Sequence, residues 1–162
     1  MNHSLFLPGS ECLIQTLDGN TPAAHRLAEM GMLPGSQLHV VRLSPLGDTL
    51  EVRMEEGETL ALRRTDLDHL GCTFTALPLN LALEKFSNPL RIRHLLGGRS
   101  FGERMAQQGL QPGTRLQVLN RTPHRILCAQ ETGKTVELGA GEAVKIIVEP
   151  LEGDAVNEPE NP

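Results

Sequence analysis

The residues of this chain that could bind a metal ion are few and widely spaced. There are six His and three Cys, with neither a C-x-x-C nor an H-x-x-x-H spacing. The nearest pair is His25 and Glu29, which lie four residues apart and would share one face of a helix. A transition-metal site needs several ligands that converge. This pair would therefore bind ferrous iron or another divalent transition metal only weakly, and a surface pair without metal is the simpler interpretation.

Sequence motifs of catalytic sites are absent as well. The chain has no G-x-S-x-G, no phosphate-binding lysine motif and no Cys–His pair in a recognisable setting. Most Ser and Asp residues fall where helix caps and turns are expected, and their side chains would hydrogen-bond the backbone there. We therefore expect that the protein is not an enzyme.

The composition excludes several kinds of partner. Four Phe, no Tyr and no Trp leave no material for base-stacking platforms or for the aromatic grooves that bind proline-rich peptides. A net charge of −5 predicts no binding of nucleic acid. The most apolar window, Thr75–Leu83, is far shorter than the ~20 residues of a membrane span, and the first residues do not resemble a signal peptide. Three scattered Cys indicate a reducing compartment. We expect a cytoplasmic protein without direct membrane insertion.

An internal repeat reveals which elements carry these residues. The phrase "EMGMLPGSQLHV" (Glu29–Val40) returns as "QQGLQPGTRLQV" (Gln107–Val118), 78 residues later. Over residues 26–40 and 104–118, seven of fifteen positions are identical, including every Pro and Gly of the turn. "GETLAL" and "GKTVEL" then match at a shift of 76, so two residues have been lost from a loop between. Self-similarity at this period predicts a duplicated domain.

Each copy predicts one short helix. In the first copy, Thr21 is a good N-cap, Pro22 suits the first helical position, and Gly31 ends the helix. In the second copy, Ser100 and Glu103 match a capping box and Gly109 ends the helix. The turns "LPGS" and "QPGT" follow.

Period-2 strands surround the helix in each copy. The strands "ECLIQTL", "SQLHVVRL" and "TLEVRM" of the first copy correspond to "LRIRHLL", "TRLQVL" and "RILCA" of the second, which also has "TVEL" and "VKIIV". Short strands, hairpin turns and one helix predict a mainly β protein made of two small β-barrels. The expected domains are barrel 1 at 8–76, a packed apolar linker at 77–88 with Leu79, Leu81 and Leu83 buried, barrel 2 at 89–150, and a disordered acidic tail at 151–162.

The first copy closely resembles the FeoA family over residues 10–73, in "MGMLPGS", "PLGDTLEVR" and "LALRRTDLDHL". The second copy resembles it over residues 89–149, but "NRTPHR" replaces the "PLGD" box. The resemblance implies two SH3-like barrels in tandem, each with an inserted helix. It also implies a cytosolic accessory protein of ferrous iron uptake, whose partner is the membrane GTPase-permease FeoB. A related barrel ends metal-dependent repressors, but no winged helix precedes it here, so repression is not expected.

The repeated turn is the best candidate for a partner contact. One of Met32 and Leu33 must face the core, and the second copy has Leu110 and Gln111 in their place. The buried member is therefore predicted to be Met32, which leaves Leu33 exposed on a rigid turn that could anchor a partner. A lone surface leucine without function is an equal alternative. The candidate partner-binding set is Met32, Leu33, Pro34 and Gly35, together with Arg63 and Arg64 of "LRRTD". For these two arginines a local ion-pair cluster with Asp66 and Asp68 is the simpler interpretation.

Two functions remain open at this stage. The first is an adaptor that binds and modulates the permease. The second is a metal-responsive regulatory module with a transition-metal site between domains or subunits. Anaerobic equilibrium dialysis with ferrous iron separates them, because micromolar stoichiometric binding would favour the second. The sequence leaves open whether two units in one chain replace a dimer of single-unit relatives.

Overall fold

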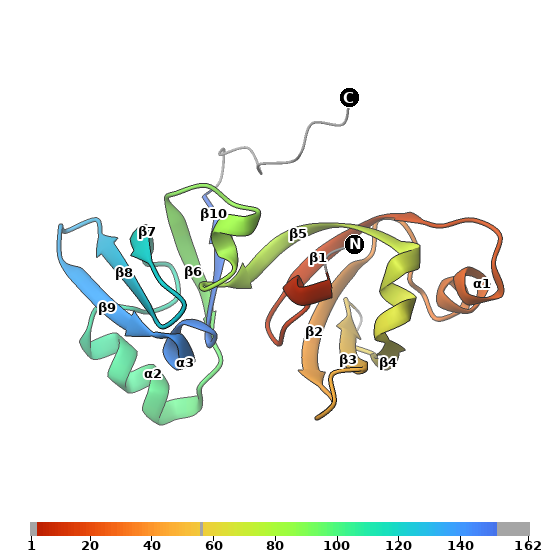
Figure 1. The fold of residues 1–162 in the computed structure, drawn as a ribbon, viewed down its shortest axis with the longest axis horizontal. Helices are drawn as coiled ribbons and strands as arrows, with labels where there is room; N and C mark the ends of the chain where they lie inside the picture. The colour runs from red at the N-terminus through yellow and green to blue at the C-terminus, as the bar shows by residue number, and fades with distance from the viewer. Residues whose placement is uncertain (1–2, 56, 152–162) are drawn as a thin grey trace. The chain divides into compact units, whose positions relative to one another are not determined.

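The computed structural model of the chain describes residues 3–55 and 57–151. The chain divides into two compact units, residues 1–75 and 76–162 (Figure 1), and each is described by itself. The predicted tail at 151–162 lies outside the described residues apart from Leu151. None of the helices in the described ranges is long and apolar enough to cross a membrane.

Unit 1 is a small antiparallel barrel with a helix inserted after its first strand. Its strands run in the order β4-β3-β2-β1-β5. Helix α1 connects β1 to β2, and the short 3₁₀ helix η2 connects β4 to β5. The elements are η1 (His3–Leu5), β1 (Glu11–Leu17), α1 (Pro22–Glu29), β2 (Gln37–Leu43), β3 (Thr49–Met54), β4 (Thr59–Arg63), η2 (Arg64–His69) and β5 (Leu70–Pro78).

Unit 2 repeats this plan. Its strands run in the order β10-β6-β7-β8-β9, and the last residues of β5 pair with β10. The elements are η3 (Ala82–Glu84), β6 (Leu90–Leu95), α2 (Gly98–Gln107), β7 (Arg115–Arg121), β8 (Arg125–Gln130), β9 (Thr135–Gly139), α3 (Ala140–Ala143) and β10 (Ile146–Pro150). The mainly β fold with two SH3-like barrels and inserted helices, predicted from the sequence, is confirmed.

Alternating strands bury one face in each unit, as the period-2 pattern predicts. Leu38 and Val40 of β2 are buried, and so are Leu50, Val52 and Met54 of β3. Register confirms the repeat, because Cys12 pairs with Leu38 while Leu90 pairs with Leu116, 78 residues further on. Equivalent positions of the two sequences therefore occupy equivalent places in the two barrels.

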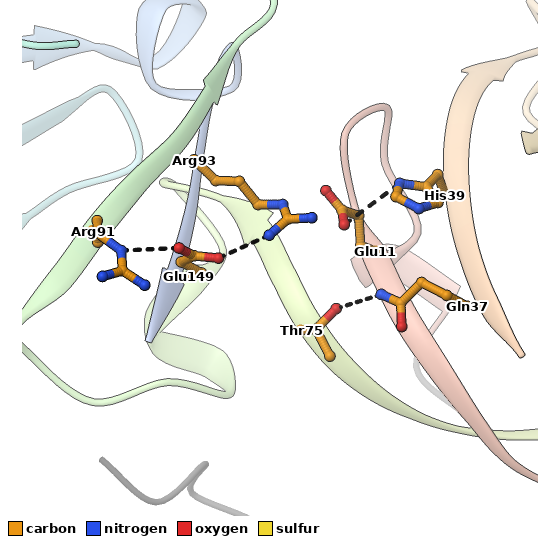
Figure 2. A network of polar contacts seen from close by, with 7 residues as sticks. All are labelled: Glu11, Gln37, His39, Thr75, Arg91, Arg93 and Glu149. Carbon is orange, nitrogen blue, oxygen red and sulfur yellow. Dashed lines mark hydrogen bonds and ion pairs between the residues drawn. The ribbon is translucent and has the colours of Figure 1, made fainter. Parts of the chain in front are cut away.

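Polar side chains brace the ends of the strands in each unit (Figure 2). In unit 1, the side-chain amide of Gln37 donates to Thr75 Oγ1 at 2.8 Å, and His39 lies 3.4 Å from the buried carboxylate of Glu11. In unit 2, Glu149 of β10 accepts from Arg91 Nε at 2.9 Å and from Arg93 Nη1 at 3.0 Å. One carboxylate therefore holds two guanidinium groups of β6, the neighbouring strand.

The predicted caps are correct for α1, whereas for α2 the predicted end at Gly109, with φ +81°, is correct and the predicted start is wrong. Thr21 Oγ1 accepts from the N–H of Ala24 at 3.1 Å, and Gly31 follows the helix with φ +91°. Helix α2 instead begins at Gly98, so Ser100 lies inside it and cannot be an N-cap. Glu103 pairs there with Arg99 at 3.0 Å, one turn earlier. A Ser followed three residues later by Glu resembles a capping box even inside a helix. This local pattern does not distinguish Ser100 from the true helix start, two residues earlier.

The stretch predicted as a linker is part of unit 2. Strand β5 runs on to Pro78, and its residues Leu77 and Pro78 pair with β10. The buried residues beyond it are Leu79, Ala82 and Phe86, whereas Leu81 and Leu83 are partly exposed. After the strand the chain turns into η3.

The two residues missing from the second copy come from one hairpin. Strand β2 ends at Leu43 and β7 ends at Arg121, which preserves the shift of 78. Strand β3 begins at Thr49 and β8 begins at Arg125, which gives the shift of 76. The deletion therefore shortens the hairpin at residues 44–48, and this is the place of the "PLGD" box.

An arginine–carboxylate bridge ties each inserted helix to its barrel. Arg26 Nη2 of α1 donates to Asp66 Oδ1 of η2 at 2.6 Å, and Asp66 Oδ2 accepts the N–H of Arg63 at 2.9 Å. In unit 2, Arg104 of α2 bonds Glu142 of α3 at 3.3 Å, and Glu142 accepts the N–H of Gly139 at 3.1 Å. The repeated Arg therefore links two elements that are remote in sequence, through an acid that also caps a helix start.

Removal of the buried acid in unit 1 is expected to be destabilising. Asp66 is only 6% exposed, and Asp66→Ala would lose both charge-assisted hydrogen bonds, at a cost of about 2 kcal/mol in the free energy of unfolding. Asp68→Ala is the control, because Asp68 is exposed and its partner among the described residues is His3, at 2.7 Å, and exposed pairs contribute about 0–1 kcal/mol. Denaturant unfolding, with amide exchange to assign the change to unit 1, measures both. Equal stability of the two variants would contradict this role.

Candidate functional site

The turn between α1 and β2 is held by backbone hydrogen bonds at every step. The N–H of Met32 donates to Leu27 O at 3.0 Å, and the N–H of Gly35 donates to Ile14 O at 2.8 Å. The N–H of Ser36 donates to Leu33 O at 3.0 Å. Gly35 has φ +95°, a conformation that favours glycine. The turn is therefore rigid, which is a property of a good contact surface.

The structure confirms which residue of this turn is exposed. Met32 is 0% exposed and Leu33 is 48% exposed. In unit 2 the equivalent Leu110 is buried and Gln111 is exposed. Pro34 and Gly35 are exposed beside Leu33. Met32 fixes the turn from inside and offers no surface of its own, so the contact would be made by the other three.

A small acidic hollow lies beside this turn. It has a volume of about 190 Å³ and is lined by Met30, Gly31, Ser36, Met54, Glu55 and Glu58. Met54 pairs with Leu38, which places this hollow at the end of β2 that follows the turn. Glu55 and Glu58 are exposed, so this end of unit 1 carries negative charge beside its exposed leucine.

The two arginines of the predicted site lie elsewhere. Arg63 pairs with Thr49 at the opposite end of β3, and Arg63 and Arg64 line a hollow of about 520 Å³ with Leu46, Gly47, Asp48, Thr49 and Thr65. The Arg64 guanidinium donates to Gly47 O at 2.6 Å and to His3 O at 2.9 Å. Seven residues of β2 separate this end from Leu33, roughly 20 Å of strand. The predicted partner-binding residues therefore form two surfaces rather than one.

The most exposed leucine of the described residues was not predicted as a contact. Leu46 is 90% exposed at the tip of the β2–β3 hairpin. Leu46 belongs to the "PLGD" box, which is part of the resemblance to the FeoA family. Its exposure could have been inferred from the sequence, because Pro45 and Gly47 place Leu46 in a hairpin turn, where a side chain cannot reach the core.

The predicted metal pair consists of two surface residues. His25 and Glu29 are both exposed on α1, and Glu29 is the last residue of that helix. Among the residues that the structure describes, no three His, Cys, Asp or Glu side chains gather as ligands. One imidazole and one carboxylate do not fit a resident transition-metal ion, which takes more ligands than these.

Two of the three thiols interact in unit 1. Cys12 is buried on β1, and Cys72 is partly exposed on the neighbouring strand β5. A hydrogen bond between the two thiols raises the pKa of Cys12, which burial raises further, and the same bond lowers the pKa of Cys72 against the opposing effect of its own burial. Cys128 lies in unit 2, where burial raises its pKa to about 11.

We expect Cys72 to be the most reactive thiol of the folded protein. At pH 8 only about one Cys128 in a thousand is ionised if its pKa is about 11, and the thiolate is the reactive form. Iodoacetamide should therefore alkylate Cys72 first, as measured by peptide mass spectrometry over time. Cys72→Val, which copies Val148 at the 76-residue shift, should remove the fast phase. Equal rates at Cys72 and Cys128 before unfolding would contradict this assignment.

The elements of the two units define the structural class of the protein. Two small SH3-like barrels follow one another in the chain, each with a helix between its first two strands and a rigid turn after that helix. The chain belongs to the FeoA family, because the FeoA domain matches residues 4–73 and 85–150. This family is associated with ferrous iron transport.

Several solved structures are similar to the chain. Iron(II) transport protein A of Clostridium thermocellum is 30% identical, with 96% of this chain and 90% of that chain covered and a TM-score of 0.51. A Pseudomonas aeruginosa protein is 38% identical over 41% of this chain and 91% of its own, with a TM-score of 0.35. FeoA of Stenotrophomonas maltophilia, described as complexed with zinc, is 21% identical over 43% and 87%, with a TM-score of 0.37.

Proposed function

We propose that this chain is a cytoplasmic accessory protein of ferrous iron uptake that binds a FeoB-type membrane GTPase-permease and modulates it. Membership of the FeoA family supports the role in iron transport. The exposed Leu33 on its hydrogen-bonded turn supports the mode of action, which is binding of another protein. In this role the protein acts by binding alone, and iron is the cargo of the partner.

The observation that carries this proposal is the contrast between Met32 and Leu33. Neighbouring apolar residues of one turn point in opposite directions, one fully buried and one 48% exposed. Burial of Met32 and the backbone bonds of the turn hold Leu33 in place before any partner arrives, so little conformational entropy is lost on binding. An apolar side chain that is already held in one position is well suited to fill a pocket on a partner.

The chemistry around Leu33 also specifies the matching surface. Pro34 and Gly35 extend the apolar contact, and the carboxylates of Glu55 and Glu58 line the hollow at the same end of the unit. A partner surface with an apolar pocket and basic side chains beside it would complement this end. Charges at the rim of such an interface mainly increase the association rate and choose between partners.

Leu33→Asp is expected to weaken binding of the permease's soluble cytosolic domain by about tenfold or more, as for the loss of an interface anchor. Gln111→Asp is the matched control, since Gln111 occupies the same place in unit 2, and it should bind like the unchanged chain. Biolayer interferometry measures both affinities, and circular dichroism checks the fold. Unchanged binding of Leu33→Asp would exclude this turn from the contact. No binding by the unchanged chain would overturn the proposed function.

A further inference from the structure

The hairpin loop between β2 and β3 of unit 1 is held by both side-chain and backbone hydrogen bonds. Ser44 Oγ donates to Asp48 Oδ1 at 2.9 Å and accepts the N–H of Thr49 at 3.2 Å. The N–H of Ser44 donates to Thr49 O at 2.9 Å, and the N–H of Gly47 donates to Ser44 O at 2.8 Å. The bond from Arg64 Nε to Gly47 O, at 2.6 Å, fixes the tip from a neighbouring element.

This rigid loop presents Leu46 almost completely to solvent. Ser44, Gly47 and Asp48 all serve the loop's own geometry, while Leu46 is 90% exposed and contributes little to packing. Isolated exposed leucines are ordinary on protein surfaces. A leucine on a loop held by side-chain and backbone bonds differs from them, because binding would bury it without the cost of ordering the loop.

Two hollows flank the leucine and meet at Thr49. The first is the hollow of about 520 Å³ that Leu46 itself lines with Arg63 and Arg64. The second, of about 490 Å³, lies along the outer side of the strands and includes Leu43, Pro45 and Ala61 among its lining residues. An anchor that protrudes between two recesses is a shape that another protein surface can match.

The charge beside Leu46 is positive, opposite to the charge beside Leu33. Arg63 is exposed in the first hollow. Arg64 donates from Nε and Nη1 to two carbonyl oxygens, which are uncharged and therefore do not neutralise the guanidinium. Asp48 is the one carboxylate among the residues that line this hollow, and Ser44 binds it. A partner with carboxylates around an apolar pocket would complement this end of the unit.

Unit 2 keeps part of the hydrogen bonding at the equivalent place but not the leucine. Thr122 donates its N–H to Arg125 O at 2.8 Å and accepts the N–H of Arg125 on Oγ1 at 3.1 Å, as Ser44 does with Thr49. The hairpin of unit 2 is two residues shorter, and Thr122, Pro123 and His124 stand where unit 1 has the leucine-bearing loop. All three are exposed, and none is a large apolar residue. The same barrel therefore closes this hairpin without Leu46, so the fold alone does not require the longer loop.

We infer that the Leu46 hairpin, with Arg63 and Arg64, is a second docking surface that inserts Leu46 into an apolar, carboxylate-rimmed pocket on the cytosolic part of the permease. This inference rests on the proposed function, and it adds a surface at the opposite end of β2 from Leu33. Unit 1 then contacts its partner through two leucines in regions of opposite charge, which would fix the orientation of the barrel on that partner.

The test measures binding of the same soluble cytosolic domain to single variants of the full chain. Leu46→Asp should weaken binding by at least about tenfold, while Pro123→Asp, at the equivalent tip of unit 2, should leave the affinity unchanged. Arg63→Glu should slow association, most strongly at low salt. Arg125→Glu is its matched control, because Arg125 is exposed at the equivalent end of unit 2, where it pairs with Gly139 as Thr49 pairs with Arg63. Since Leu46, Arg63 and Arg125 are exposed, these variants should fold, and circular dichroism verifies this.

The outcomes separate this inference from the proposed function. Loss of affinity with Leu46→Asp but not with Pro123→Asp supports the second surface. The second surface is contradicted if Leu46→Asp binds with unchanged affinity, or if Pro123→Asp loses as much affinity. In either case the Leu33→Asp result still tests the proposed function separately. Equal effects of Arg63→Glu and Arg125→Glu would show that only the net charge of the chain matters, which contradicts a carboxylate-rimmed pocket around Leu46. An unchanged chain that does not bind the domain overturns both proposals.

Discussion

The bridge between the inserted helix and the short helix before the last strand is the contact on which each unit depends. Arg26 and Asp66 are 40 residues apart in sequence, and their bond ties α1, the helix that precedes the turn with Leu33, to the barrel. Because Asp66 also caps η2, one buried carboxylate positions two elements at once. The turn that carries Leu33 follows α1 directly, so its place depends on the same bond. The second unit keeps this arrangement with Glu142, a longer acid that meets Arg104 at the longer distance of 3.3 Å.

Comparison of the two units separates the features that the barrel requires from those that it leaves free to vary. Both units keep the helix, the Pro–Gly turn, the buried residue that begins it and the arginine–acid bridge. They differ at the exposed positions, where unit 1 has Leu33 and Leu46 and unit 2 has Gln111 and a shorter polar tip. Packing tolerates little change in a buried position, whereas an exposed turn residue is free to vary. The large apolar residues that unit 1 exposes at these two places are therefore the features that the fold itself does not explain.

Core chemistry differs between the units without change in architecture. The positions of Cys12 and Cys72 correspond to Leu90 and Val148, which are both buried in unit 2. A free thiol behaves as a small apolar group in a core, so either choice packs. Reactivity is another matter, because a thiolate forms more readily at a partly exposed thiol that accepts a hydrogen bond than at an isolated buried one. The structure therefore distinguishes Cys72 from Cys128, although the sequence presents them as equivalent.

The sequence by itself determined the strands, the α1 caps, the duplication and the exposure of Leu33. These features are set by neighbours within a few residues, such as alternation, a Thr–Pro helix start and a Pro–Gly turn, or by comparison of one copy with the other. Only the tertiary structure decided the start of α2, the extension of β5 to Pro78, and the partners of Arg26 and Arg64. It also separated Arg63 from Leu33 and brought it beside Leu46. These outcomes depend on strand register and on contacts across the barrel, which join residues tens of positions apart and leave no periodic trace in the chain.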